Sequence, residues 1–257
     1  MALKNLARKA VRAKTRLRWR IWNGLDAMRP VPDRMTCPLC GAARAASEFP
    51  ERLARCAFQG GRIRRRECPE CGVVFGSPRM LGMSEERLSR EYRDLYFTYE
   101  EGDTTEAEVA AFRALRPRPS GTYLNFGSGR WSKAADRVRA EGYRLVEYEP
   151  YAQPGTANPS LVTEWDALAR MKFDGIMSNN LIEHVQDPVA LLRRLTTLLT
   201  DDAASMVHAT ACYRYEYEYS RFHLFFFTGR SAEVLAQRAG LRLEHTDHPD
   251  VKRFTRA

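Results

Sequence analysis

The chain has 257 residues, of which 44% are hydrophobic, enough to bury the core of one ordinary domain with a smaller unit beside it. No apolar run approaches the roughly 20 residues of a membrane span, and no signal peptide is visible, so we expect a soluble, cytoplasmic protein. The net charge of +9 is concentrated in residues 1–30, which hold nine Lys or Arg against one acid, Asp26. The near-neutral remainder argues against a nucleic-acid-binding face across the main domain.

Residues 1–30 are predicted to form a basic amphipathic arm. Apolar side chains recur there at helical spacing, and most basic side chains fall on the other side of the helix. The apolar positions are Leu3, Leu6, Ala10, Ala13, Leu17, Ile21, Leu25 and Met28, with Trp19 and Trp22 near the border. Such a helix suits an anionic membrane surface, which would make the protein peripheral at the cytoplasmic face of the membrane. Two other interpretations stay open, namely docking on the rest of the protein and an Arg-rich targeting segment.

Two cysteine pairs mark the second unit, residues 31–83. A Cys-Pro-x-Cys-Gly motif occurs at Cys37 and Cys40 and again at Cys68 and Cys71. Four thiolates on two tight turns match a closed tetrahedral structural Zn²⁺ site, so we predict a zinc ribbon. Two disulfides or free thiols are the alternative, which a cytosolic chain disfavours.

The segment between the cysteine pairs is rich in arginine. Zinc ribbons can bind nucleic acid, so this segment is the best support for an RNA-binding alternative, although such a run is more often a solvated face. The residues are Arg52, Arg55, Arg62, Arg64, Arg65 and Arg66.

A helical linker is predicted over residues 84–119. Residues 84–99 read as a helix capped by Ser84, with Glu85 and Glu86 in its first turn. A run of prolines and arginines ending in Gly121 then marks a boundary, and we place the last domain at residues 120–257.

A glycine turn near the start of this domain is the main functional signal. The apolar run at residues 122–126 ends in Gly127-Ser128-Gly129, and residues 133–141 read as a helix. In this arrangement the glycine backbone can come close to a ligand, and the free N–H groups at the start of the helix favour an anionic one. Glu149 follows the next predicted strand, residues 144–148, about 20 positions after the turn, where nucleotide-binding units place a ribose-binding carboxylate.

The rest of the domain alternates strands with helices. Such alternation predicts an α/β fold, a Rossmann-like doubly wound and mostly parallel sheet with its ligand at the carboxyl ends of the strands. Strands are expected at residues 160–162, 173–178, 203–210 and 241–244, and helices at residues 188–199 and 231–239.

These motifs together resemble the successive signatures of class I S-adenosylmethionine-dependent methyltransferases. The signatures are Asn125-x-Gly127-x-Gly129, Glu149-Pro150, and Phe173-Asp174 followed by Ser178-Asn179-Asn180-x-x-Glu183-His184-Val185. The double cysteine motif upstream and the run from Phe222 to Thr228 downstream are similar to a bacterial subgroup that carries an N-terminal zinc ribbon and modifies sugars, glycans or small metabolites. The resemblance covers roughly residues 35–245.

The resemblance implies a set of cofactor-binding residues. The glycine loop would pass beside the methionine part of S-adenosylmethionine, Glu149 would hold the ribose, Asp166 or Trp165 would lie near the adenine, and Asn179 to Leu181 would line the other side. The expected set is Asn125, Gly127, Ser128, Gly129, Glu149, Asp166, Asn179, Asn180 and Leu181. Three positions depart from the family pattern, which usually has an acid in place of Asn125 and glycines in place of Trp131 and Glu147.

Methyl transfer needs alignment of donor and acceptor and sometimes removal of a proton from the acceptor. His184 and His223 are the catalytic candidates, because they fall in segments expected at the strand ends. The alternating Tyr213, Tyr215, Tyr217 and Tyr219 would lie on one face of an extended chain, which favours a sugar or glycan hydroxyl as acceptor. Two alternatives remain: an RNA methyltransferase that grips RNA with the ribbon, and an inactive relative that serves as an assembly module.

Overall fold

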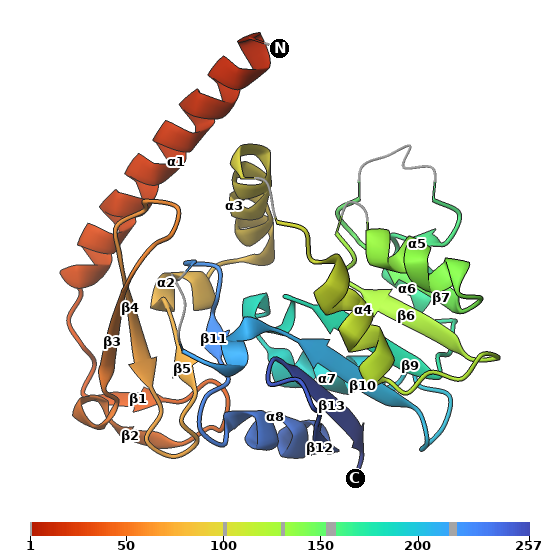
Figure 1. Ribbon diagram of the computed structural model, residues 1–257. Helices are drawn as coiled ribbons and strands as arrows, with labels where there is room; N and C mark the ends of the chain where they lie inside the picture. Colours follow the sequence, from red (N-terminus) through yellow and green to blue (C-terminus); the bar gives the residue numbers. More distant parts are fainter. Residues whose placement is uncertain (1, 100–101, 130–131, 153–157, 216–219) are drawn as a thin grey trace.

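The structure, a computed structural model, describes residues 2–99, 102–129, 132–152, 158–215 and 220–257. Its main feature is a seven-stranded sheet with the order β12-β13-β10-β9-β6-β7-β8 (Figure 1). The strands are β6 (Thr122–Phe126), β7 (Arg144–Tyr148), β8 (Leu161–Val162), β9 (Gly175–Asn179), β10 (Ser205–Ala209), β12 (Leu241–His245) and β13 (Val251–Arg256). β13 pairs antiparallel with both neighbours and the other pairs are parallel, which confirms the predicted Rossmann-like, mostly parallel sheet.

The position of β6 determines where a ligand can bind. β6 lies between β7 and β9, so the chain winds first to one side of β6 and then to the other. Ligands of such sheets bind at this reversal, outside the carboxyl ends of the strands.

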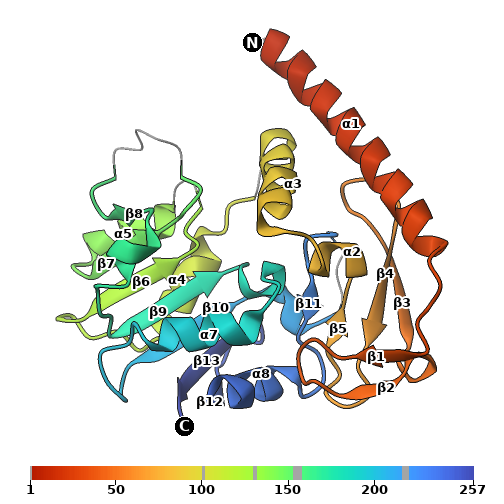
Figure 2. The ribbon, with the colours of Figure 1, turned by 180° about the vertical axis from the view of Figure 1, so that it is seen from behind.

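Helices cover both faces of the sheet (Figures 1 and 2). α4 (Thr105–Ala114) and α5 (Lys133–Ala140) lie on one face, and α7 (Pro188–Thr196) and α8 (Ser231–Ala239) on the other. Short α6 (Trp165–Leu168) follows β8. Alternate strand residues serve the two faces, because Tyr123 packs in the cluster with α4 and α5 while Leu124 belongs to the core on the other side.

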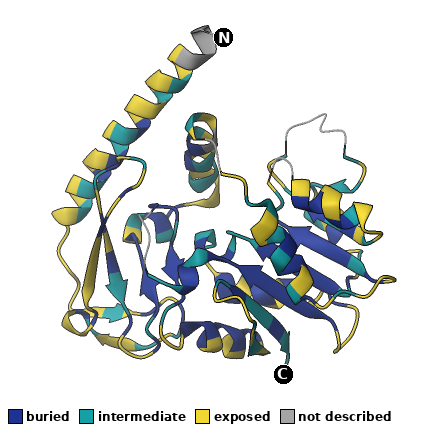
Figure 3. Cartoon of the chain, in the orientation of Figure 1, coloured by how far each residue is buried: buried dark blue, intermediate teal, exposed yellow. Residues whose placement is uncertain are grey.

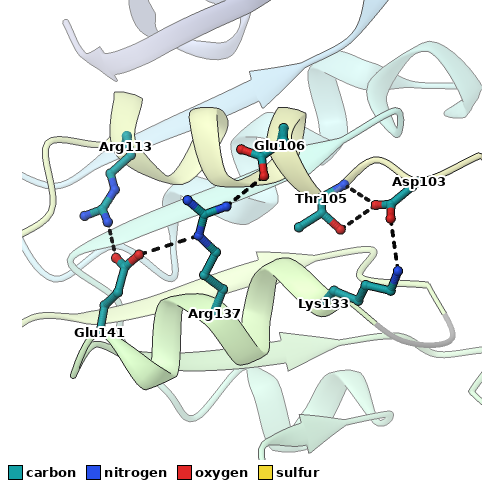
Figure 4. Close-up of polar contacts among 7 residues, drawn as sticks. All are labelled: Asp103, Thr105, Glu106, Arg113, Lys133, Arg137 and Glu141. Carbon is teal, nitrogen blue, oxygen red and sulfur yellow. Dashed lines mark hydrogen bonds and ion pairs between the residues drawn. The ribbon is translucent and has the colours of Figure 1, made fainter.

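Polar side chains also connect α4 with α5 on the solvent side (Figure 4). Asp103 pairs with Lys133 at 3.0 Å, and Arg137 pairs with Glu106 at 2.8 Å. Exposed pairs of this kind contribute little to stability, so the buried cluster beneath them holds the two helices in place.

A second, four-stranded sheet has the order β11-β5-β4-β3. It contains β3 (Glu51–Arg55), β4 (Arg62–Glu67), β5 (Val74–Phe75) and β11 (Phe225–Phe226), and β1 (Arg34–Thr36) and β2 (Ala43–Ala45) form a separate hairpin. β11 follows β10 in the sequence but pairs antiparallel with β5. Buried residues of both parts, including Phe49 and Leu192, therefore belong to one core cluster. The domain boundaries proposed from the sequence stay predictions.

The N-terminal arm is the helix α1 (Ala2–Ala27), which docks beside α3 (Glu85–Thr98) and the four-stranded sheet (Figure 1). The Trp19 indole N–H donates to Glu91 at 2.8 Å, and the buried Arg221 guanidinium stacks on the Trp19 ring at 4.8 Å. The helix therefore docks through its tryptophan side, as the docking interpretation requires.

The apolar side of α1 faces away from the protein (Figure 3). We call its exposed residues the apolar stripe; they are Leu6, Leu17, Ile21, Leu25 and Met28. None of the described helices has both the length and the apolarity needed to cross a membrane.

Several local expectations differ from the structure. Ser84 precedes α3, but its side chain makes no capping hydrogen bond in the part of the chain that is described. α2 (Pro78–Leu81) and β13 match none of the expected elements, while α4 lies within the segment expected to be a helical linker. Short 3-10 helices occur at Ala46–Glu48, Ile182–His184 and Ala211–Tyr213.

Candidate functional site

The glycine loop meets Glu149 at the carboxyl ends of β6 and β7. The Gly127 and Ser128 amides donate to the Tyr148 carbonyl at 2.9 and 3.2 Å, which folds the loop over the end of β7. The Glu149 carboxylate accepts one hydrogen bond from the Gly129 amide at 3.0 Å and one from the Tyr151 amide at 3.0 Å. Burial raises the pKa of Glu149, and these two amides oppose that shift. Each carboxylate oxygen keeps capacity for a further donor, as a pair of ribose hydroxyls would require.

Two buried polar atoms beside this loop have no hydrogen-bond partner among the described residues. They are the side-chain amide nitrogen of Asn125 and the Ser128 hydroxyl. Gly127 has a φ of +76°, and a Cβ there would lie 2.9 Å from the Leu181 side chain. The loop therefore passes close to the end of β9, and the unpaired polar atoms fit a polar ligand such as S-adenosylmethionine.

The other expected cofactor residues surround the same edge of the sheet. Asn179 ends β9, and the Asn180 amide donates to the Ala209 carbonyl at 2.8 Å. Asp166 is exposed in the first turn of α6, while Trp165 packs edge-on against Tyr148 with ring centroids 6.2 Å apart.

One departure from the family pattern has a clear structural explanation. Glu147 is buried, and its carboxylate accepts hydrogen bonds from Arg139 at 2.6 Å and Asn158 at 2.7 Å. The ion pair and the second donor compensate the buried charge. Trp131, another departure, lies outside the described residues.

A cavity of about 640 Å³ opens beside the strand ends. Its walls come from α1, α3, the turn between β3 and β4, and the segments after β9 and β10. Asn180 and both catalytic candidates, His184 and His223, line it. The cavity therefore adjoins the expected cofactor residues, and its volume lies within the range of about 300 to 1,000 Å³ that is typical of small-molecule sites.

Glu183, His184 and His223 form a compact group in this cavity, with candidate ligand atoms all within 4.8 Å of one another. The Nδ1 atom of His184 lies 2.9 Å from the Phe222 carbonyl oxygen, which can only accept. We therefore assign the proton to Nδ1, leaving a lone pair on Nε2, which lies 3.9 Å from Glu183.

The two histidines differ in their electrostatic environment. Burial, with the nearby His184 and Arg65 charges, lowers the pKa of His223 to about 3. His223 is therefore a neutral and weak base near pH 7. Burial raises the pKa of Glu183, which accepts a hydrogen bond from the Thr210 hydroxyl at 2.7 Å. In the sequence, Glu183 stands out only as part of the motif that includes His184, the residue directly after it.

The predicted tyrosine face is wrong for its first members. Tyr213 ends a 3-10 helix rather than an extended strand, and its buried hydroxyl donates to the His208 carbonyl at 3.2 Å. Tyr215 packs edge-on against Phe226, with ring centroids 4.8 Å apart. Tyr217 and Tyr219 lie outside the described residues. Among the described residues, the Trp, Tyr and Phe side chains that line the cavity come from distant segments and are Trp19, Phe58, Tyr92 and Tyr99.

The four cysteines of the two motifs converge at one point, with ligand atoms within 4.8 Å of one another. Sulfur atoms of Cys37 and Cys71 lie 3.9 Å apart, and those of Cys40 and Cys68 lie 3.6 Å apart. Four sulfurs around a zinc ion would be about 3.8 Å apart, whereas a disulfide bond measures about 2.05 Å. The distances between these sulfurs are compatible with a four-thiolate zinc site and are too long for disulfide bonds.

The arginine segment of the ribbon is largely occupied by internal contacts. Arg52 pairs with Glu67, and both Arg64 and Arg66 pair with Glu51. Buried Arg65 donates to the carbonyl groups of Ser220 and His223. These contacts weaken the case for an RNA-binding loop.

Comparisons with known proteins agree with this fold. The 1,6-didemethyltoxoflavin-N1-methyltransferase of Burkholderia thailandensis, solved with bound 1,6-didemethyltoxoflavin and S-adenosylhomocysteine, shares 15% identity over 76% of this chain and 95% of its own, with a TM-score of 0.52. CalO1, a methyltransferase of calicheamicin biosynthesis, shares 13% identity over 67% of this chain with a TM-score of 0.45, and the chain covers 59% of its length. The mitomycin 7-O-methyltransferase MmcR shares 15% identity over 68% of this chain with a TM-score of 0.43, again with 59% of its length covered. No curated protein sequence matches the chain.

A family model described as a methyltransferase domain matches residues 102–246, more than half of the chain. The matched segment contains the glycine loop, Glu149, and the Glu183–His184 motif, which the structure places at one edge of the sheet. The chain therefore belongs to this family of S-adenosylmethionine-dependent methyltransferases.

Proposed function

We propose that the protein transfers a methyl group from S-adenosylmethionine to a small-molecule acceptor bound in the cavity beside the strand ends. The observation that carries this proposal is the placement of Glu149 against the glycine loop, with the cavity directly beside Asn180. The loop and Glu149 would hold the ribose and methionine parts of the cofactor. The unpaired Asn125 amide nitrogen is a donor and would bind a cofactor oxygen.

When bound, S-adenosylmethionine supplies a methyl group already activated on a sulfonium. The protein then has to align the acceptor, exclude water and accept a proton. We propose that His184 accepts the proton that the acceptor loses. Its Nδ1–H donates to the Phe222 carbonyl, which leaves the lone pair on Nε2 to act as the base. Glu183, 3.9 Å away, would stabilise the imidazolium as it forms. His223 remains the second candidate.

We further propose that the acceptor is a sugar, glycan or related metabolite with a reactive hydroxyl. The cavity combines aromatic rings, including Tyr92 and Tyr99, with the hydroxyls of Thr98 and Ser220. Rings stack on the apolar faces of sugars while hydroxyls bind their polar edges. These residues, and not the alternating tyrosines, support a sugar as the acceptor.

The test has two parts. Calorimetry should detect S-adenosylmethionine binding to the purified full-length protein, and a protein that binds neither the cofactor nor S-adenosylhomocysteine would contradict the proposal. Mass spectrometry of metabolites and surface glycans from a deletion strain should then show a species lighter by one methyl group than in the parent strain. An RNA substrate would appear instead as a lost methyl mark on RNA and a salt-dependent affinity for RNA.

We also propose that the four-cysteine cluster holds one structural Zn²⁺. The four sulfur atoms gather at one point, and the two sulfur–sulfur distances of 3.6 and 3.9 Å are close to those that a four-thiolate zinc ion imposes. Metal analysis of protein purified without added zinc should give close to one equivalent per chain. Absence of metal in freshly purified, reduced protein would contradict the assignment.

For localisation, we propose a cytoplasmic enzyme that associates with an anionic membrane surface through α1. The apolar stripe is exposed, and the basic residues Lys9, Lys14 and Arg20 on the same helix are exposed too. A helix with both features lies in the plane of the lipid headgroups.

A further inference from the structure

The docked side of α1 contributes three polar residues to the cavity that holds His184 and His223. Arg12, Thr15 and Arg16 all line it. Their spacing along the helix is i, i+3 and i+4, so their side chains leave one face of α1 as neighbours. The basic arm therefore forms a wall of the proposed acceptor site.

Among the described residues, no acid pairs with the charges on this wall. Within the described part of the chain, Arg12 and Arg16 make no ion pair, and each donates to one backbone carbonyl, of Thr98 and Phe58 respectively. Arg18, two residues further on, instead pairs with Glu91 and Asp94 at 2.9 Å. Glu183 is the single acid among the described residues that line the cavity. A concave site with two unpaired cations attracts anions.

Thr15 gives an independent sign that this wall binds a polar group. Its side chain is 3% exposed, and its hydroxyl has no hydrogen-bond partner among the described residues. A buried hydroxyl is costly unless it is paired. A ligand oxygen bound between Arg12 and Arg16 would provide that partner.

We infer that Arg12, Thr15 and Arg16 bind a phosphate group carried by the methyl acceptor; this inference rests on the methyl-transfer function proposed above. Two guanidinium groups from adjacent helical turns match the two negative charges of a phosphate monoester or a diphosphate. Each guanidinium group can donate two parallel hydrogen bonds to two phosphate oxygens. The acceptor would then span the cavity, with its phosphate at α1 and its reacting hydroxyl near His184. The docked side of the arm would then recognise the substrate, while its apolar stripe stays exposed to solvent.

The site can be tested by calorimetry with inorganic pyrophosphate and full-length protein. We expect the double variant Arg12→Ala/Arg16→Ala to bind pyrophosphate at least about tenfold more weakly than the wild type, because two charge-assisted contacts are lost. Thr15→Val should weaken binding about threefold or more, which corresponds to the loss of one neutral hydrogen bond. The matched control is Arg20→Ala, since Arg20 also donates to a carbonyl of the same turn, Gln59, but does not line the cavity.

Equal pyrophosphate affinity in the wild type and the double variant, or an equal loss in the Arg20→Ala control, would overturn the assignment. If malonate binds as tightly as pyrophosphate, the site recognises carboxylates as well as phosphates, and the phosphate assignment is overturned. Competition by phosphatidylglycerol vesicles would identify a lipid headgroup as the ligand and overturn the link to the acceptor. S-adenosylhomocysteine binding is measured on the same samples: if it fails, the proposed function fails, whereas intact binding without a pyrophosphate signal contradicts only the phosphate site.

Discussion

Glu149 is the residue on which the cofactor assignment depends most directly. Its carboxylate already accepts the Gly129 amide, so a ribose at the loop would meet it. Glu149→Ala should weaken S-adenosylmethionine binding by an order of magnitude or more, because hydrogen bonds to a charged group contribute about 1.5 to 3 kcal/mol each. Calorimetry of the folded variant measures this change, with Glu244→Ala on the distant β12 as the control. Unchanged affinity in Glu149→Ala would show that the ribose binds elsewhere.

His184 is predicted to carry the proton-transfer step. His184→Ala should slow methyl transfer by about 100-fold or more while leaving cofactor affinity nearly unchanged, because general base catalysis contributes about 100- to 10,000-fold. His223→Ala should have the smaller effect, since the His223 pKa is lowered to about 3 and the ring is a poor proton acceptor at neutral pH. Single-turnover rates of the two variants show which substitution slows methyl transfer more. Full rates in both would mean that neither histidine is the base.

His208 is predicted to make the protein sensitive to acid. It is fully buried, its Nδ1 lies 2.6 Å from the Ser178 hydroxyl, and burial lowers its pKa to about 3. Below an unfolded pKa of about 6.5 only the unfolded chain takes up the proton, so the free energy of unfolding falls as pH falls. At pH 5 the loss from such a group is about 2 kcal/mol.

Denaturant unfolding at pH 7.5 and pH 5 measures this effect. His208→Asn should lose less stability between the two pH values than the wild type does. The control is His245→Asn, since His245 is exposed and should leave the loss unchanged. An equal loss in His208→Asn and the wild type would contradict the assignment.

At the scale of single elements, α1 presents its apolar stripe to solvent. Replacing Leu17 and Ile21 together by Ser should reduce binding to anionic vesicles about tenfold or more, because burying one such side chain contributes about 1.5 to 3 kcal/mol. Both side chains are exposed, so the docked face of the helix stays intact. Vesicle sedimentation is the measurement, and Leu53→Ser, which changes an exposed Leu on β3, is the control. If the wild-type protein does not sediment with the vesicles, membrane association is contradicted.

Elements with a strong local pattern were predicted well from the sequence. β7 and α8 have the predicted bounds, and β6 ends at the glycine turn as expected. β11 could not be found, because its two residues form a strand only by pairing with β5, far back in the chain. The contribution of α1 to the cavity wall could not be predicted from the sequence either, since Arg12 reaches the cavity only because the arm docks there. Local periodicity shows which residues share a face of a helix but not what covers that face.

At the scale of the whole molecule, the ribbon and the main sheet form one packed unit. β11 extends the ribbon sheet, the Gly76 amide donates to the Leu224 carbonyl at 3.1 Å, and Arg238 of α8 donates to the Leu39 carbonyl at 2.6 Å. One cluster of buried residues also runs through both parts. Loss of the proposed zinc site should therefore destabilise the whole molecule and not the ribbon alone.

Cys68→Ser is expected to lower the single thermal transition of the protein by several degrees, since each kcal/mol of lost stability shifts Tm by about 2 to 4 °C in a chain of this size. Calorimetry should still show one transition, because the shared core couples the two parts. Cys56→Ser is the control, as Cys56 is buried but lies outside the cluster of four cysteines. Two separate transitions, with that of the seven-stranded sheet unmoved, would show instead that the ribbon unfolds independently of the methyltransferase fold.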